Sequence, residues 1–149
     1  MEQDARFDGL AAVLNKVLEK DANAVVVRLV VGGSTVDGDL MVARHHDENL
    51  RFTPHDVSVL YLATPRDMLG GELVVWPGVT AEKVLRKKPA VVWPVKNVLV
   101  KFRGDSEHKV RGFASVFGEK RISLVIEQYC IPKKKYQLTV EYCVNETCF

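Results

Sequence analysis

His45 and Asp47 are the two residues of this sequence whose types and spacing most directly suggest chemistry. They flank His46, one residue after the end of a β-type run over residues 40–43. Along a strand, side chains two positions apart point to the same face, so His45 and Asp47 can reach one point while His46 faces the other way. An imidazole nitrogen and a carboxylate oxygen that converge in this way are two of the three ligands of the facial triad that suits ferrous iron.

The pair also permits a simpler interpretation when it is taken alone. His-x-Asp occurs by chance in many chains, and both residue types are common on protein surfaces. His55, a few residues further on, is by default a surface or loop histidine rather than a metal ligand. The rest of the chain must therefore decide whether the pair belongs to a site.

The elements that must position these residues are mainly strands. Runs rich in β-branched residues and bounded by Gly, Pro or Asp predict strands over residues 24–31, 40–43, 57–63, 72–76, 90–93, 98–102, 109–116 and 122–130, with a last one over 137–143. Apolar residues at helical spacing predict one amphipathic helix over residues 5–20, with Asp4 as its N-cap, and residues 81–88 are a short second helical candidate. Without a βαβ repeat, this pattern favours a mainly β sandwich or barrel.

Length and composition fit one domain over residues 1–149. A chain of this size with 47% hydrophobic residues can bury a core of its own. No apolar run approaches the roughly 18 to 20 residues of a membrane span, and the polar, acidic N-terminus differs from a signal peptide, so we expect an intracellular protein, cytoplasmic or nuclear. The three cysteines lie in the last twenty residues and predict free thiols rather than a disulfide framework: Cys130, Cys143 and Cys148.

Charge is distributed unevenly along the chain. Residues 1–75 hold 7 basic and 12 acidic side chains, a balance of −5, whereas residues 76–149 hold 14 and 7, a balance of +7, which together give the net charge of +2. Such asymmetry can indicate an acidic partner such as nucleic acid, but strands that interleave in space make ordinary solvated faces the simpler interpretation. The basic run over residues 133–135 is interpreted as a solvated turn.

Further features follow the His-x-Asp pair in a definite order. A strand containing Tyr-Leu, over residues 57–63, precedes a Gly-Gly-Glu turn at residues 70–72. A strand over residues 98–102 ends in Phe and precedes His108, with a Val two positions later. A long apolar strand then opens with the Arg-x-Ser pattern of residues 121–123.

In this order of features, over residues 25–129, the chain resembles the double-stranded β-helix oxygenases that use Fe(II) and 2-oxoglutarate, especially the prolyl hydroxylase branch. That family shows His-x-Asp, a Tyr-Leu strand, a Gly-Gly-Glu turn, a strand ending in Phe, a distal His followed by Val, and an Arg-x-Ser strand. Every member occurs here in the same order. The resemblance implies a jelly-roll fold supported by one N-terminal helix, with a core over about residues 25–129.

The resemblance also implies a chemistry. His45, Asp47 and His108 match the catalytic residues that hold Fe(II), with 2-oxoglutarate and O2 as co-substrates and ascorbate as a further candidate cofactor. The implied reaction hydroxylates an unactivated C–H bond and releases succinate and CO2. A prolyl or similar side chain of a protein or peptide is the first substrate hypothesis. Oxidation of a nucleic-acid base or a small molecule is the alternative, and a non-catalytic binding module on the same scaffold is the remote one.

Arg121 matches the residue that binds the distal carboxylate of 2-oxoglutarate in this family. A guanidinium suits that role because its planar fork can donate two hydrogen bonds to a carboxylate. Tyr61 and Ser123 are candidates for hydroxyl contacts to the same carboxylate, although Tyr61 also fits a plain core position and Ser123 a packed small residue. Of the other cations nearby, Lys120 faces the opposite side of the strand and Arg111 is close to His108 in sequence.

A second resemblance covers one strand. The residues from Arg121 to Val125, with Gln128 five positions after Ser123, look like the last core strand of the methylcytosine dioxygenases of the ten-eleven-translocation and base-J-binding type. Such enzymes need a pocket for a flipped base and a basic groove. The second half of the chain has the charge, but not the aromatic and basic interleaving of a stacking platform. The candidate substrate-covering loop is residues 77–89.

Overall fold

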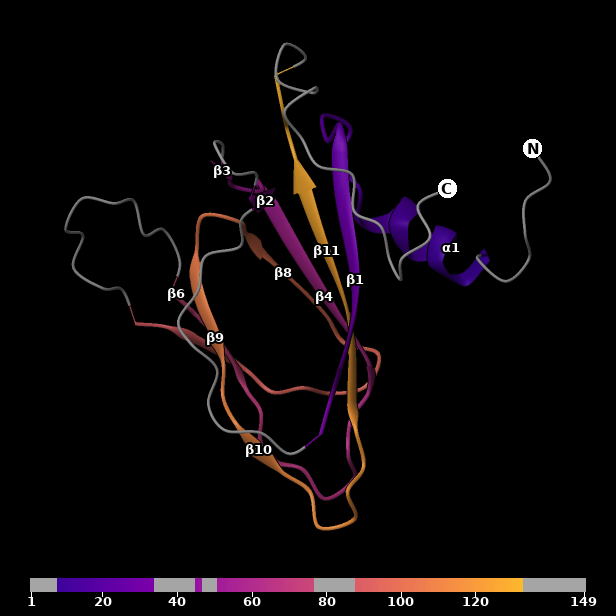
Figure 1. Cartoon of the computed structure of the whole chain (residues 1–149), viewed down its shortest axis with the longest axis vertical. Helices are drawn as coiled ribbons and strands as arrows, with labels where there is room; N and C mark the ends of the chain where they lie inside the picture. The colour runs from indigo at the N-terminus through magenta and orange to yellow at the C-terminus, as the bar shows by residue number, and fades with distance from the viewer. Residues whose placement is uncertain (1–7, 34–44, 47–50, 77–87, 133–149) are drawn as a thin grey trace.

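The computed structural model describes residues 8–33, 45–46, 51–76 and 88–132 (Figure 1). These residues form one helix and a series of mostly short strands: α1 Asp8–Val17, β1 Ala24–Gly32, β2 His45–His46, β3 Arg51–Phe52, β4 Asp56–Ala63, β5 Leu69–Gly70, β6 Leu73–Trp76, β7 Ala90–Val92, β8 Leu99–Arg103, β9 Glu107–Val110, β10 Phe113–Ala114 and β11 Arg121–Tyr129. The protein is therefore mainly β, as the sequence predicts.

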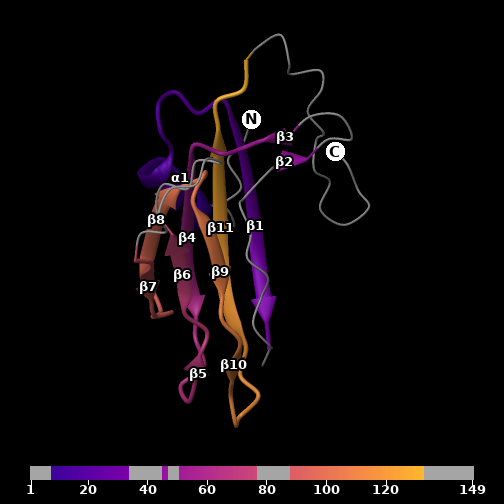
Figure 2. The ribbon, with the colours of Figure 1, turned by 90° about the vertical axis from the view of Figure 1, so that its left-hand side faces the viewer.

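Two antiparallel sheets make up the body of the protein. The larger has the strand order β1-β11-β4-β8, and the smaller has the order β7-β6-β9. Side chains of β4 and β6 pack against each other in one apolar cluster, so the sheets face each other as a sandwich. Figure 1 shows β1, β11 and β4 on one side of this arrangement and β6 and β9 on the other, and Figure 2, viewed from the left of Figure 1, shows β6 and β9 over β4 and β11. Two short pairs, β10 with β5 and β2 with β3, complete the described strands.

The two faces of the larger sheet bury different partners. On the outer face, Leu124 and Ile126 of β11 pack under α1, together with Val17 at the end of that helix. On the inner face, Val57 and Val59 of β4 belong to the cluster that faces β6. This alternation follows from the two-residue period of a strand, which sends neighbouring side chains of β11 to opposite faces. The inner face is consequently the face available for a site between the sheets.

Most of the predicted elements that fall on described residues are confirmed within a few residues. The predicted helix over residues 5–20 ends at Val17 in the structure, and its described part begins at Asp8. The predicted strands over residues 40–43 and 137–143, and residues 81–87 of the second helical candidate, lie outside the described residues. The short strands β2, β3 and β5 are not among the predicted ones. Each is two residues long, and so short a segment shows almost no hydrophobic periodicity.

The prediction of one strand over residues 109–116 is wrong. The structure has β9, which pairs with β6, and β10, which pairs with β5, separated by Arg111 and Gly112. At the break, the backbone N–H of Gly71 donates to the carbonyl of Gly112 at 3.0 Å. Gly70 has φ +87°, and a Cβ there would lie 2.5 Å from the same carbonyl oxygen, so the Gly-Gly turn permits this close crossing.

In the part of the chain that the structure describes, no helix combines the length and apolar character that crossing a bilayer requires.

Gln128 ties the end of α1 to β11 from a fully buried position. Its Nε2 donates to the carbonyl of Val17 at 2.9 Å, and its Oε1 accepts from the backbone N–H of Glu19 at 2.7 Å. The side chain therefore satisfies the backbone at the helix end, on the face of the sheet opposite to the inner one. Its position gives it a structural role that the second resemblance did not anticipate.

We expect Gln128→Leu to lower the free energy of unfolding by about 1 to 3 kcal/mol, because it leaves the buried carbonyl of Val17 and the partly buried N–H of Glu19 without their partners. Urea unfolding followed by circular dichroism measures this change. A stability equal to that of the wild-type protein would show that the two hydrogen bonds contribute nothing net.

Candidate functional site

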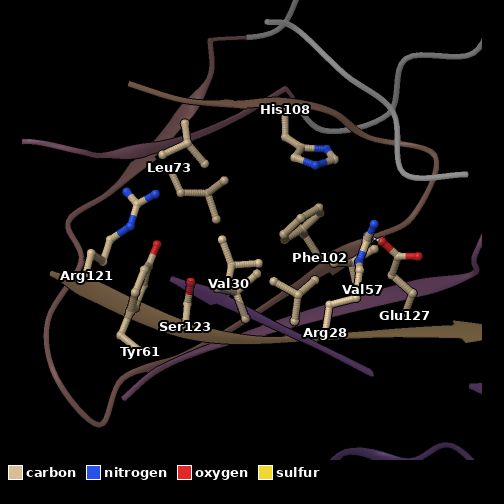
Figure 3. A pocket seen from close by; sticks show the side chains of 13 residues that line it. Arg28, Val30, Val57, Tyr61, Leu73, Phe102, His108, Arg121, Ser123 and Glu127 are labelled. Carbon is tan, nitrogen blue, oxygen red and sulfur yellow. Dashed lines mark ion pairs between the residues drawn. The ribbon is translucent and has the colours of Figure 1, made fainter. Parts of the chain in front are cut away.

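A cavity of about 280 Å³ lies between the two sheets, near the lower end of the size range of small-molecule sites (Figure 3). Its walls come from strands of both sheets. The lining side chains are Arg28, Val30, Val57, Val59, Tyr61, Leu73, Phe102, His108, Val110, Arg121, Ser123, Val125 and Glu127. Most of the wall is apolar, with a few polar groups at defined places, which is the usual composition of a ligand site.

Strand β11 sets the order of the polar groups along the cavity. Arg121, Ser123 and Glu127 share its inner face, because they are separated by even numbers of residues. In register across the sheet, Ser123 pairs with Tyr61 and Glu127 pairs with Val57. Arg121 and Tyr61 therefore lie at one end of the cavity and Glu127 at the other, as Figure 3 shows.

Arg121 is a partly buried cation at the first of these ends. Its Nη1 donates to the carbonyl of Gly71 at 3.2 Å, and its guanidinium lies 5.2 Å from the centre of the Phe113 ring. Burial lowers the pKa of Arg121, which Tyr61 partly offsets. Among the described residues, no carboxylate forms an ion pair with Arg121. The guanidinium remains charged near neutral pH and retains donors toward the cavity.

Tyr61 and Ser123 are the hydroxyl groups beside Arg121. Tyr61 is 3% exposed and belongs to the apolar cluster of the inner face as well as to the cavity wall, so it is both a core residue and a lining residue. Burial raises the pKa of Tyr61, against the opposing influence of Arg121, and the phenol therefore stays protonated and can donate. Ser123, 5% exposed, lies opposite it in register.

His108 of β9 enters the same cavity from the smaller sheet (Figure 3). It is 8% exposed, and its ring centre lies 5.0 Å from that of Phe102. Its Nδ1 lies 3.2 Å from the carbonyl oxygen of Ser106. Because a carbonyl can only accept, Nδ1 carries the proton and the lone pair of the neutral ring is on Nε2. Metal-binding histidines show this arrangement, in which the second ring nitrogen donates to a backbone carbonyl.

Burial lowers the pKa of His108 from the ordinary value of 6.5, and the nearby positive charge of Arg28 lowers it further. In the unfolded chain the ring regains its ordinary pKa, so below about pH 6.5 the unfolded state binds more protons than the folded state. The contribution to stability is complete above that pH and is lost as the pH falls through the folded pKa. His108 consequently stays neutral, and able to bind a metal, at neutral pH.

We expect the free energy of unfolding of the metal-free protein to fall as the pH is lowered below about 6.5, and to fall less in His108→Gln, which lacks the titrating ring. Urea unfolding of both proteins across this range measures the difference. Parallel curves for the two proteins would show that His108 titrates in the folded state as it does in the unfolded one.

The side chains of the other two predicted iron ligands lie outside the part of the chain that the structure describes. His45 lies in β2, where its backbone pairs with Phe52, and the structure does not describe its side chain. Asp47 lies outside the described residues. Within the described ranges, no three His, Cys, Asp or Glu side chains form a group that could hold a metal. His108 is thus the predicted ligand that the structure places in the cavity, and the assignment of His45 and Asp47 remains a sequence prediction.

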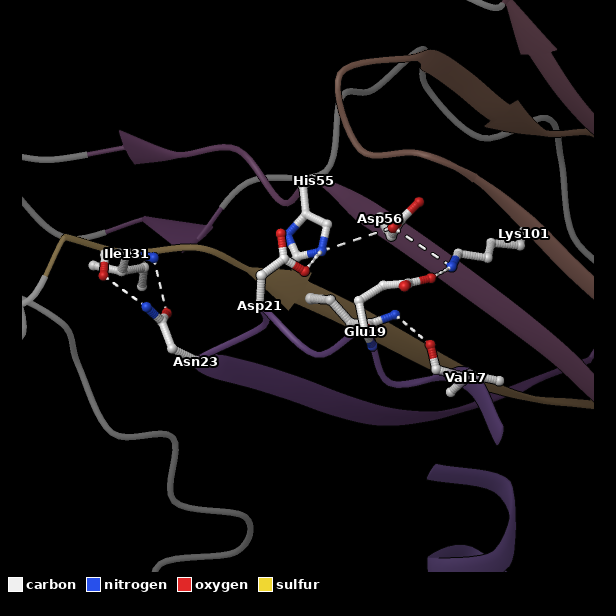
Figure 4. Close-up of polar contacts among 9 residues, drawn as sticks. Val17, Glu19, Asp21, Asn23, His55, Asp56, Lys101 and Ile131 are labelled. Carbon is white, nitrogen blue, oxygen red and sulfur yellow. Dashed lines mark hydrogen bonds and ion pairs between the residues drawn. The ribbon is translucent and has the colours of Figure 1, made fainter. Parts of the chain in front are cut away.

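The alternative histidine and the alternative basic residues considered from the sequence lie outside the cavity wall. His55 does not line the cavity; its Nε2 lies 3.9 Å from Asp21 Oδ1 and 3.7 Å from Asp56 Oδ2, beside the helix end (Figure 4). Arg111 has Nη1 3.9 Å from Glu72 Oε1 and does not line the cavity either. Lys120 is exposed to solvent. Of the basic candidates around this strand, Arg121 is the one in the cavity wall.

An ion pair that the sequence motifs did not predict lies at the second end of the cavity, between Arg28 of β1 and Glu127 of β11. Glu127 is 2% exposed, and its Oε2 accepts from the phenol of Tyr129 at 2.7 Å. A signal for this pair was present, because Arg28 is the one charged residue of β1, and Glu127 is the one charged residue of β11 after Arg121 at its start. Such a charge is rarely buried without a partner.

No protein-family model and no curated protein matches the chain. Solved structures do match it. A 2OG-Fe(II) oxygenase family oxidoreductase from Burkholderia pseudomallei is 18% identical with a TM-score of 0.52, over 86% of this chain and 52% of its own. A prolyl-4-hydroxylase from Pseudomonas putida is 23% identical with a TM-score of 0.52, over 86% and 63%. A prolyl hydroxylase from Trichoplax adhaerens is 19% identical with a TM-score of 0.50, over 80% and 50%.

These likenesses establish a shared fold. At the level of fold, they confirm the resemblance to 2OG-Fe(II) oxygenases and prolyl hydroxylases that the sequence motifs indicate. The chain spans about half to two-thirds of the length of the solved proteins that it matches. What those proteins do is therefore carried to this chain only as a proposal, supported by the cavity.

Proposed function

We propose that this chain is an Fe(II)- and 2-oxoglutarate-dependent dioxygenase that hydroxylates an unactivated C–H bond. In this proposal residues 1–149 form one catalytic domain, a double-stranded β-helix with its core over about residues 25–129. The sandwich of two antiparallel sheets and the matches to 2OG-Fe(II) oxygenases support that architecture.

The observation that carries the proposal is that Arg121 and His108 line the same cavity. A partly buried guanidinium has lost part of its hydration, and no carboxylate among the described residues compensates for that loss. A bound carboxylate would supply the missing counter-charge. With the phenol of Tyr61 and the hydroxyl of Ser123 beside it, this end of the cavity has the donors to hold the distal carboxylate of 2-oxoglutarate.

His108 fits the proposed iron site for a separate reason. Its neutral ring, with Nδ1 donating to the carbonyl of Ser106, directs the available lone pair to Nε2. His45 and Asp47 would supply the remaining nitrogen and oxygen ligands of the facial triad. When bound, the iron would supply the chemistry that couples O2 and 2-oxoglutarate to hydroxylation, with succinate and CO2 as the other products.

The protein's own share of the reaction is to bind, orient and exclude water. Arg121 would orient the co-substrate by binding its far carboxylate, which leaves the other end of that molecule for the part of the cavity that His108 lines. Val57, Val59 and Phe102 line the intervening wall with apolar surface. This lining keeps bulk water away from the reacting groups.

The proposed substrate is a prolyl or similar side chain of a protein or peptide. Two solved structures that share the fold are prolyl hydroxylases, and that from Trichoplax adhaerens is in complex with a hypoxia inducible factor peptide fragment. Oxidation of a nucleic-acid base or a small molecule is the alternative that the same assay would reveal.

A succinate-release assay tests the proposal. Protein with Fe(II), 2-oxoglutarate and O2, with and without ascorbate, is incubated with pools of proline-containing peptides, DNA oligonucleotides and small molecules. We expect succinate formation that depends on Fe(II) and is stimulated by the peptide pool. Stimulation by DNA or small molecules instead would change the substrate class, whereas no succinate under any condition would refute the proposed reaction.

A further inference from the structure

The end of the cavity opposite Arg121 holds a second guanidinium, which the proposed co-substrate does not use. Arg28 of β1 reaches across to Glu127 of β11, and both side chains line the cavity (Figure 3). Arg121 and Glu127 are six residues apart on one strand face, roughly 20 Å along an extended chain. Arg28 and Arg121 are therefore separate polar sites in one cavity.

Glu127 holds Arg28 in place. The Glu127 side chain is 3% exposed, its Oε1 pairs with Arg28, and its Oε2 accepts from the Tyr129 phenol at 2.7 Å. Both carboxylate oxygens thus have partners inside the protein. A carboxylate fixed in this way serves to orient the guanidinium rather than to bind a ligand itself.

Arg28 keeps hydrogen-bonding capacity after this pairing. A guanidinium carries five N–H donors, and one carboxylate can accept only part of them. The Arg28 side chain is 55% exposed, in contrast to its buried partner, so its remaining donors are accessible from the cavity and from solvent. They suit an oxygen acceptor, either a carboxylate or a carbonyl, on a molecule that enters from outside.

Arg28 also lines the cavity on the same side as the proposed metal ligand His108, away from Arg121 (Figure 3). In register, Glu127 pairs with Val57 and Val57 pairs with Phe102, whose ring contacts His108. The second guanidinium is thus near the place where oxidation would occur.

We propose that Arg28, oriented by Glu127, determines substrate specificity by binding a carboxylate or carbonyl oxygen close to the oxidised C–H bond. This inference rests on the proposed dioxygenase function, and it defines the substrate class as one that carries an oxygen acceptor next to the reacting carbon. A peptide offers such a carbonyl at every residue, and a small acid offers a carboxylate.

The test is a binding titration of the full chain loaded with Fe(II) and 2-oxoglutarate without oxygen. The probes are acetyl-alanyl-proline with a free carboxylate and the same peptide as its amide. We expect Arg28→Gln to weaken binding by about tenfold to a hundredfold, the loss that follows when a hydrogen bond to a charged group is removed. Loss for the free acid alone identifies a carboxylate as the acceptor, whereas equal loss for both probes identifies a carbonyl.

Two further variants separate recognition from folding. Arg28→Lys keeps a positive charge beside the buried Glu127, and we expect it to fold and to bind more weakly than wild type. Arg66→Gln is the matched control, because Arg66 forms an exposed ion pair with Glu119 outside the cavity, and we expect wild-type binding. The amplitude of thermal unfolding verifies that each variant is folded.

Other outcomes would overturn the inference. Unchanged peptide affinity in folded Arg28→Gln and Arg28→Lys, or no binding of either probe by the wild type, would exclude Arg28 as a substrate anchor. An equal loss of 2-oxoglutarate affinity would assign Arg28 to the co-substrate instead. Failure of the wild type to bind 2-oxoglutarate at all is a different result, which refutes the proposed function rather than the role of Arg28.

Discussion

Arg121→Lys is expected to weaken the binding of 2-oxoglutarate to the iron-loaded protein by about tenfold to a hundredfold, equivalent to roughly 1.5 to 3 kcal/mol. The guanidinium can donate two parallel hydrogen bonds to a carboxylate, whereas an ammonium offers a point charge of different reach. The substitution would also remove the hydrogen bond that Arg121 donates to the carbonyl of Gly71. Anaerobic calorimetric titration of 2-oxoglutarate measures the change.

The affinity for iron should be nearly unchanged in Arg121→Lys, because Arg121 is not a proposed ligand. Arg111→Lys is the matched control, since Arg111 is close in sequence but lies by Glu72 outside the cavity. We expect wild-type affinity for 2-oxoglutarate in this control. A reduced affinity in Arg111→Lys together with wild-type affinity in Arg121→Lys would move the carboxylate site to Arg111.

The second large effect is expected from His108→Ala, which should lower the affinity for Fe(II) by more than the roughly hundredfold that removal of a supporting partner costs. His108 would be a direct ligand, and its loss leaves two protein ligands where the facial triad needs three. Asp47→Ala should have the same effect. Equilibrium dialysis with Fe(II) in the absence of oxygen measures both.

Two other histidines serve as controls for the metal site. His55→Ala removes a histidine that lies beside Asp21 and Asp56, outside the cavity, and should keep iron. His46→Ala should also keep iron, because the strand period directs it away from His45 and Asp47. Loss of iron from His46→Ala equal to that from His45→Ala would show that the predicted ligand register is off by one residue.

The sequence predicted the inner face of β11 because a strand has a simple period. Arg121 and Ser123 are two residues apart, so both point into the cavity wherever that strand lies. Leu124 and Ile126, at odd spacing from Arg121, point to the outer face of the same strand, which α1 covers. These features depend on local spacing alone, and local spacing is what a single sequence displays.

Features that depend on pairing between distant segments were not predicted. Arg28 and Glu127 are almost one hundred residues apart in the chain, and only the register of β1 with β11 brings them together. The break between β9 and β10 depends on Gly71 crossing close to Gly112, which no periodicity reveals. Gln128 owes its burial to the end of α1. Which side chains meet depends on how distant strands align in the fold, and a single sequence does not display that alignment directly.

We propose that one cavity holds both the metal, through His108, and the co-substrate, through Arg121. The metal dependence of 2-oxoglutarate binding to the wild-type protein is the decisive measurement for this arrangement. Anaerobic calorimetric titration is performed with and without Fe(II), and with succinate as a comparison ligand. We expect 2-oxoglutarate to bind much more tightly with Fe(II) present, and we expect the affinity for succinate, which lacks the 2-oxo group, to increase less. Equal affinity with and without the metal would contradict this arrangement.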